Sequence, residues 1–193
     1  MQTENKNVKI KIKSQISDLI MSDIYTTART IDMIDDEINH TYKRGSDTAM
    51  EDYFDDAVND KIEYSTQGTL SVNGEKIIVS YEESELMGLD GCETSLYFNK
   101  ISPNIVTMTR TGSVVSGLVF DPTDKRHICT YETDFMPIEF CICTRSVGNN
   151  LTYDNGGTLN LDYDIEVRGV RTERNRLTLE VINIKGGENS ERC

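Results

Sequence analysis

Apolar and polar residues alternate strictly in the first predicted element of the chain. Between residues 8 and 17, the apolar side chains of Val8, Ile10 and Ile12 fall at even positions, and lysines fall at three of the odd ones. A hydrophobic period of two is typical of a half-buried β-strand. We therefore expect a strand at 8–17 with one buried face and one solvated, cationic face.

Residues 18–60 follow a different pattern, in which apolar residues recur at steps of three and four. This spacing predicts amphipathic α-helices. The Lys-Arg-Gly run at residues 43–45 is typical of a helix end, and Thr48 with Glu51 matches a capping box that starts a second helix. The segment is predicted to be an α-helical hairpin. The apolar stripe of its second helix includes Met50, Tyr53 and Phe54.

Alternation returns at residue 61 and continues to the end of the predicted core at residue 185. Asn73-Gly74 is a strong signal for a two-residue hairpin turn, because both positions tolerate positive φ. Short alternating runs separated by turn residues are typical of antiparallel sandwiches and barrels, and short connections favour an up-and-down barrel. Beyond the first strand, strands are expected near 62–72, 75–83, 92–98, 106–110, 118–120, 125–133, 136–145, 159–167 and 177–181.

These elements predict a mainly β protein with one domain over residues 1–193. We expect an antiparallel up-and-down barrel of about eight to ten strands. Its core comprises 8–17 and 61–185, with the acidic helical hairpin of 18–60 as an insertion. The polar tail at 186–193 is expected to be loose.

Charge and cysteine content narrow the classes of function and location. The 193 residues carry a formal net charge of −13, and residues 18–60 alone hold 12 acidic and 3 basic residues. This acidity argues against binding to nucleic acid or to an anionic membrane surface, since both present negative phosphates. No apolar run approaches the ~18 residues of a membrane-spanning helix, and no signal sequence is visible. The five cysteines are an odd number, which fits reduced thiols in the cytoplasm.

A set of short motifs runs through the predicted strands between Tyr64 and Ile184. Its members are Thr66-Gln67-Gly68, Tyr81-Glu82-Glu83-Ser84 with Gly88, Thr94, Arg110 with Gly112, Phe120, His127, Tyr131-x-Thr133, Thr144 and Tyr163. Together they resemble the YwiB-like family of bacterial proteins, whose members have a calycin-like β-barrel. Two features depart from that family: its Thr-Pro-Tyr-Gly turn is Thr-Asp-Phe-Met at 133–136, and the helical insertion has no counterpart in typical members.

The resemblance implies a calycin- or lipocalin-like barrel fold and a cytoplasmic bacterial protein. It implies no reaction, because none is assigned to the family. Calycin barrels often bind small molecules, but this expectation rests on the fold alone.

Polar residues on strand faces that are otherwise apolar form the candidate binding site. Parity places Tyr81, Arg110 and His127 on such faces. A guanidinium, an imidazole and phenols suit an anionic or carboxylate-bearing small molecule. The competing interpretation is an internal network in which Arg110 pairs with Glu83 and stabilises the fold without a ligand. If these faces line one cavity, the residues that converge near one mouth are Tyr81, Glu83, Arg110, His127 and Tyr131.

The expected function is non-enzymatic binding of a small, anionic molecule inside the barrel. The alternative is a protein-interaction or homodimerisation module, which would use Met50, Tyr53 and Phe54 of the hairpin while the barrel interior is packed. An amphipathic stripe must be buried somewhere, so the pattern favours packing of the hairpin onto its own barrel over an interface.

Catalysis and metal binding have little support in the sequence. Glu82 and Glu83 are adjacent on a strand and point to opposite faces, so they cannot act as a converging acid–base pair. Cys129, Cys141 and Cys143 supply three thiols without the fourth ligand of a typical structural zinc site. We therefore predict no catalytic residues, no metal site and no cofactor.

Overall fold

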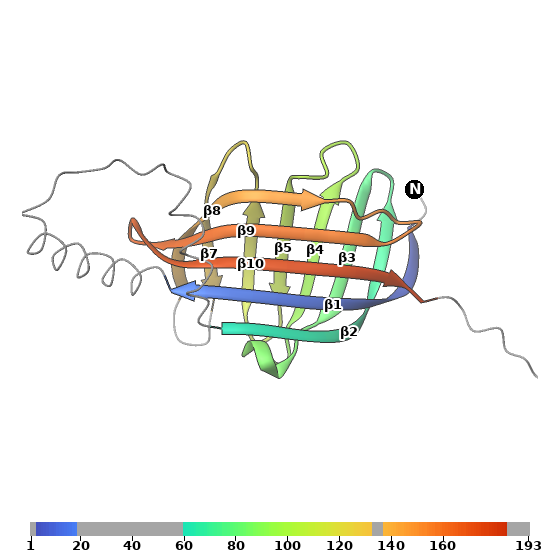
Figure 1. Ribbon diagram of the computed structural model, residues 1–193, viewed down its shortest axis with the longest axis horizontal. Helices are drawn as coiled ribbons and strands as arrows, with labels where there is room; N and C mark the ends of the chain where they lie inside the picture. The colour runs from blue at the N-terminus through green and yellow to red at the C-terminus, as the bar shows by residue number, and fades with distance from the viewer. Residues whose placement is uncertain (1–2, 19–59, 133–136, 185–193) are drawn as a thin grey trace, which may run out of the picture.

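The computed structural model describes residues 3–18, 60–132 and 137–184, which form a closed antiparallel barrel of ten strands (Figure 1). Each strand pairs with the next along the chain, and β10 pairs with β1 to close the barrel. A short 3-10 helix, η2 (Glu85–Met87), lies between β3 and β4. The strands are β1 (Glu4–Asp18), β2 (Asp60–Asn73), β3 (Lys76–Glu82), β4 (Glu93–Asn99), β5 (Val106–Thr111), β6 (Val115–Phe120), β7 (Arg126–Glu132), β8 (Pro137–Asn149), β9 (Gly157–Val167) and β10 (Val170–Asn183).

The predicted up-and-down barrel is thus confirmed, while several strands are longer than the alternation indicates. β1 begins at Glu4 because its backbone pairs with β2 from the Glu4–Val72 pair onward. β8 continues past Arg145 to Asn149, through a register irregularity opposite β9. Backbone pairing with a long neighbour extends a strand beyond its apolar residues, since ladder hydrogen bonds do not depend on side-chain polarity.

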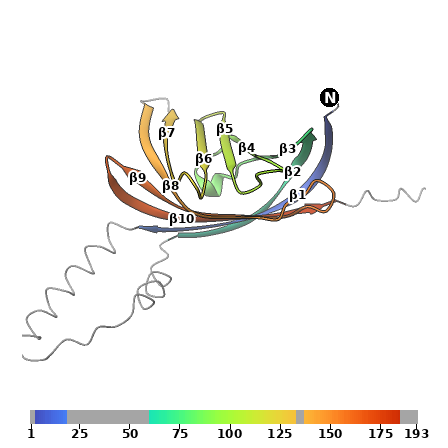
Figure 2. The same ribbon diagram turned by 90° about the horizontal axis from the view of Figure 1, so that it is seen from above.

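The strands differ in length, which gives the barrel two kinds of wall. β1, β2, β8, β9 and β10 have 11 to 15 residues, whereas β3 to β7 have 6 or 7. The long strands run side by side across the front of Figure 1, and the short strands cross behind them. Seen from above in Figure 2, the long strands curve into a bowl that the short strands cover.

The inward side chains of the strands make up the core. On β1 the predicted apolar residues Val8, Ile10 and Ile12 are buried, and Lys9 and Lys11 on the opposite face are exposed. Phe120 and Tyr163 pack in the interior with their ring centroids 4.8 Å apart. The face assignments made from parity are therefore confirmed on this strand.

The predicted helical hairpin and the tail fall on residues 19–59 and 185–193, which lie outside the described residues. The proposed interaction residues Met50, Tyr53 and Phe54 lie outside them as well. Among the residues that the structure does describe, no helix is long and apolar enough to cross a membrane.

Candidate functional site

One end of the barrel interior is polar, and the other is apolar. On β3, β4, β5 and β6, apolar inward residues lie toward the end marked by the Asn73-Gly74 turn, and a polar one lies at or just beyond the opposite end of the strand. Since neighbouring strands are antiparallel, these polar positions meet at the same end. They are Glu83, Thr94, Arg110 and Ser116.

Glu83 is the centre of this polar end. Its Oε1 atom accepts a hydrogen bond from Thr94 Oγ1 at 2.6 Å, and its Oε2 atom accepts one from Tyr64 Oη at 2.8 Å. The Glu83 side chain is only 2% exposed. A buried carboxylate is tolerated when its oxygens are hydrogen-bonded and a cation lies near, and both conditions hold here.

Arg110 supplies the cation. Its Nε atom lies 3.6 Å from Oε1 of Glu83, within ion-pair range, and its side chain is 14% exposed. This Nε atom is buried and has no hydrogen-bond partner. Ser116, which is paired with Arg110 across β5 and β6, likewise has a buried hydroxyl without a partner. A buried donor without a partner costs free energy. Arg110 Nε and the Ser116 hydroxyl can therefore each form a hydrogen bond with a ligand.

Four tyrosines lie near Glu83 and Arg110, and the charge of at least one of these two residues shifts the pKa of each phenol. Burial raises the pKa of Tyr64 and Tyr81, and the negative charge of Glu83 raises both further. Burial also raises the pKa of Tyr131 and Tyr163, while the Arg110 charge acts in the opposite direction on all four phenols. The tyrosines thus remain protonated, and able to donate, throughout the neutral range.

The structure brings together four of the five residues proposed from sequence, namely Tyr81, Glu83, Arg110 and Tyr131. It does not bring His127 to them. His127 lies four residues before Tyr131 on β7, roughly 13 Å along the strand. The Nε2 atom of His127 is buried in another part of the barrel and has no hydrogen-bond partner. Parity predicts which face a residue occupies but not its height along the barrel axis.

The sequence reasoning missed four residues of this polar end: Tyr64, Thr94, Ser116 and Tyr163. A usable signal existed for all four, because each shares the parity of apolar inward neighbours on its own strand, β2, β4, β6 or β9. A search for every polar residue on an inward face would have found all four. Tyr163 is buried at the same parity as Leu159 and Leu161 on β9, and the Arg110 charge lowers its pKa against the larger effect of burial.

A cavity of about 740 Å³ lies at the opposite end of the barrel, beside Val72 and Gly74. Ile77, Phe98 and Leu151 form part of its buried lining. Lys100 stands at its rim and donates a hydrogen bond from Nζ to the Gly74 carbonyl at 2.9 Å. This cavity is separate from the Arg110 site, because the two occupy opposite ends of β3 and β4.

The three thiols considered for a metal lie on different faces. Cys129 is paired with Phe140 and belongs to the interior cluster, whereas Cys143 lies with Arg126 and Glu166 on the outer face. Burial, and then the neighbouring Cys141, raise the pKa of Cys143 to about 11. Arg126 donates two hydrogen bonds to Glu166, at 2.7 and 2.8 Å, and thereby lowers the pKa of that carboxyl. The described ranges contain no cluster of three or more residues suited to holding a metal ion.

Comparison with protein families gives a match over residues 49–179, to the family described as Domain of unknown function (DUF1934). The chain belongs to the DUF1934 family. The match covers more than half of the chain and includes every residue named above for the polar end of the barrel. The family description assigns no activity to DUF1934 proteins.

Among solved structures, this DUF1934 chain is similar to the "Crystal structure of ywiB protein from Bacillus subtilis", with a TM-score of 0.57 and 19% sequence identity. The similarity covers 91% of this chain and 92% of that one. At this identity the likeness shows the fold alone, and it confirms the resemblance to YwiB-like barrels. No curated protein matches the chain.

Proposed function

We propose that this protein binds a small anionic molecule, with a carboxylate or a similar planar anion, at the polar end of the barrel. The observation that carries the proposal is the buried Nε atom of Arg110, which has no hydrogen-bond partner although it lies beside Glu83. A guanidinium offers five donors in a fork that matches a carboxylate. An anion entering this end of the barrel satisfies donors that the protein itself leaves unpaired.

The surroundings of Arg110 support binding without catalysis. Each oxygen of Glu83 already accepts a hydrogen bond from a hydroxyl group, so the carboxylate serves to hold Tyr64 and Thr94 in place. The phenols of Tyr81 and Tyr163 are deeply buried and stay protonated, which suits them to donate to an anion. The proposed protein is therefore a binding barrel whose ligand leaves unchanged.

We also propose a cytoplasmic location. The described cysteines Cys92, Cys129, Cys141 and Cys143 are all free thiols, which is the usual state in a reducing compartment.

Native mass spectrometry of the purified full chain tests the binding proposal. We expect a stoichiometric adduct that is lost on denaturation and that is absent from the Arg110→Met variant. Two matched controls lose a cation elsewhere: Lys100→Met at the opposite mouth, and Arg168→Gln at an exposed position. Both should retain the adduct. If the protein carries no adduct as purified, benzoate and other simple carboxylates are titrated by calorimetry.

Three results would contradict the proposal. An adduct retained by Arg110→Met excludes the polar end as the site. An adduct lost only in Lys100→Met places the ligand in the cavity of about 740 Å³ instead. Failure of every carboxylate to bind a protein without an adduct leaves the Arg110–Glu83 pair with a purely structural role. Circular dichroism of each variant verifies that the barrel is still folded.

A further inference from the structure

The cavity of about 740 Å³ beside Gly74 has the size and the lining of a second binding site. Small-molecule sites commonly measure about 300–1,000 Å³ and combine an apolar floor with a few polar groups. Ile77 and Phe98 are each 3% exposed here, and Leu151 is 4% exposed. Val72 is paired with Ile77 and is half-buried. The buried part of the lining is therefore apolar, and an apolar ligand that covers it is removed from water.

Hydrogen bonds between loops hold the wall of this cavity in place. Asn149 donates from Nδ2 to the Pro103 carbonyl at 2.8 Å, which ties the end of β8 to the loop between β4 and β5. Asn150 Oδ1 accepts a hydrogen bond from the Thr158 backbone N–H at 2.7 Å. A preformed wall lowers the entropy cost of binding, because the ligand does not have to order these loops.

A buried hydrogen-bond acceptor beside the cavity lacks a partner among the described residues. Asn183 is paired in register with the buried Val8, so its side chain lies on the inner face of β10. Its Nδ2 atom donates to the carbonyl of Asp154, a residue of the cavity lining, at 2.6 Å. The Oδ1 atom of the same amide is the unpartnered acceptor. The bond to Asp154 thus holds this free oxygen next to the cavity.

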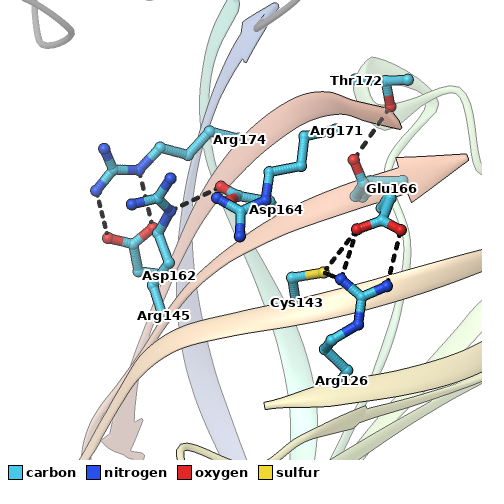
Figure 3. Close-up of polar contacts among 10 residues, drawn as sticks. Arg126, Cys143, Arg145, Asp162, Asp164, Glu166, Arg171, Thr172 and Arg174 are labelled. Carbon is cyan, nitrogen blue, oxygen red and sulfur yellow. Dashed lines mark hydrogen bonds and ion pairs between the residues drawn. The ribbon is translucent and has the colours of Figure 1, made fainter. Parts of the chain in front are cut away.

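Buried carboxylates on the outer face of the barrel are paired instead. Figure 3 shows Asp164 with Arg145 and Glu166 with Arg126, and the shortest nitrogen–oxygen distance is 2.7 Å in each pair. Both carboxylates therefore have partners within the protein. A buried acceptor without a partner costs free energy, and a ligand that donates a hydrogen bond removes this cost for Asn183.

Charged groups of both signs stand at the rim of the cavity. Glu4, Lys100 and Asp154 belong to its lining, and all three are exposed. Lys6 donates from Nζ to the Asp154 carbonyl at 3.4 Å, and Glu75 adds an exposed carboxylate in the turn between β2 and β3. The carboxylates disfavour an anion, and exposed ion pairs contribute little affinity for a cation. A neutral ligand therefore suits this end better than a charged one.

We propose that this cavity is a second binding site, for a neutral aromatic molecule that carries one N–H or O–H donor. The ring covers the apolar floor and packs against Phe98, since aromatic rings bury a large apolar area and pair favourably with one another. The donor binds the free Oδ1 atom of Asn183. The inference does not depend on an anion at the polar end, because the two sites occupy opposite ends of β3 and β4.

Equilibrium dialysis of the full chain with indole tests the site. Indole is neutral and aromatic and has one N–H donor, whereas N-methylindole has the same ring system without the donor. We expect indole to bind about tenfold more tightly than N-methylindole, as for one buried hydrogen bond. Indoleacetate and tryptamine, an anionic and a cationic analogue, should bind more weakly than indole. The proposal is overturned if indole does not bind up to its solubility limit, or if any of the three analogues binds more tightly.

Two variants show where indole binds. Val72→Trp fills the cavity from β2 and should weaken indole binding by about tenfold or more. Val115→Trp is the matched control, because Val115 is 45% exposed on β6 at the polar end, and it should bind indole like the wild-type protein. Asn183→Leu should abolish the preference for indole over N-methylindole. A preference retained by Asn183→Leu would exclude this residue as the acceptor, and circular dichroism verifies that each variant is folded.

Nuclear magnetic resonance of the wild-type protein locates indole without any substitution. Indole should shift the backbone amide signals of Gly74 and Leu151 and leave those of Arg110 and Ser116 in place. Shifts confined to Arg110 and Ser116 would place indole at the polar end and overturn the proposal. The Arg110→Met variant keeps the two proposed sites distinguishable, since it should lose benzoate binding and retain indole binding.

Discussion

The Nε atom of Arg110 lies 3.6 Å from Oε1 of Glu83, which is close enough for charge attraction and too long for a hydrogen bond. The same oxygen accepts its hydrogen bond from Thr94 at 2.6 Å. The two charges are therefore neighbours that do not satisfy each other's hydrogen-bonding needs. An arginine held in this way can turn toward an anionic ligand without losing a hydrogen bond to the protein.

The Glu83→Gln variant should bind an anion more tightly than the wild-type protein. Glutamine keeps an oxygen that accepts from Thr94 or Tyr64, and it removes the negative charge that repels a carboxylate ligand. We expect about a tenfold gain in affinity, equivalent to about 1.4 kcal/mol. Calorimetric titration with benzoate measures it. Glu82→Gln, on the exposed face of β3, is the matched control and should leave the affinity unchanged. Weaker binding by Glu83→Gln would show that Glu83 contacts the ligand directly.

The protein should lose stability above pH 10. Burial raises the pKa of Tyr81 and Tyr163 in the folded state, whereas unfolded tyrosines ionise near pH 10. Above this pH the folded state holds more protons than the unfolded state, so the free energy of unfolding is at its full value below pH 10 and falls as the pH rises. Each such tyrosine contributes a slope of up to about 1.4 kcal/mol per pH unit. Urea denaturation between pH 8 and about 11.5 measures the slope.

Tyr163→Phe tests the same linkage at a single residue. Phenylalanine retains the packing against Phe120, whose ring centroid lies 4.8 Å away, and it removes one titrating group. The stability of this variant should therefore fall less steeply above pH 10 than that of the wild-type protein. A wild-type stability that is flat up to the end of this pH range would contradict the assignment.

Asp164→Asn should destabilise the barrel although Asp164 belongs to an outward face. The substitution removes the negative charge that pairs with both Arg145 and Arg171. We expect a loss of about 1–3 kcal/mol in the free energy of unfolding, as for a buried, charge-assisted hydrogen bond. Urea denaturation measures it, with the exposed Asp90→Asn as a control that should change little. Arg145→Gln alone should cost less than Asp164→Asn, because Arg171 still pairs with the carboxylate.

Two glycines near the polar end should respond differently to alanine. Gly88 adopts φ +66° at the end of η2, and an added Cβ there meets no atom within 4 Å. Gly112 adopts φ +121°, and its added Cβ collides with the carbonyl oxygen of Gly91. Gly88→Ala should therefore cost about 1–2 kcal/mol of backbone strain alone. Gly112→Ala adds overpacking to strain and should cost about 3 kcal/mol or more. Equal losses in thermal denaturation would refute this difference.

The sequence was sufficient to predict the barrel because its period is visible in the residues themselves. Val8, Ile10 and Ile12 alternate with lysines, and a strand with period two can bury only one of its faces. Short turns such as Asn73-Gly74 then favour pairing of each strand with the next. Tyr81, Glu83, Arg110 and Tyr131 could be named as candidates for the same reason, since parity alone assigns them to the interior.

The position of a residue along the barrel axis and its partners on neighbouring strands depend on the register between strands, which only the tertiary structure shows. His127 and Tyr131 share a face, but the pairing of β6 with β7 places Ser116 beside Tyr131 and leaves His127 farther along the barrel axis. Asp164 occupies an outward position by parity, and only the arginines that reach it from β8 and β10 make it buried. The face that each residue occupies follows from the local pattern of the sequence, because side-chain direction is a local property of the backbone. The height of each residue and its partners across strands were decided by long-range pairing, which no local pattern encodes.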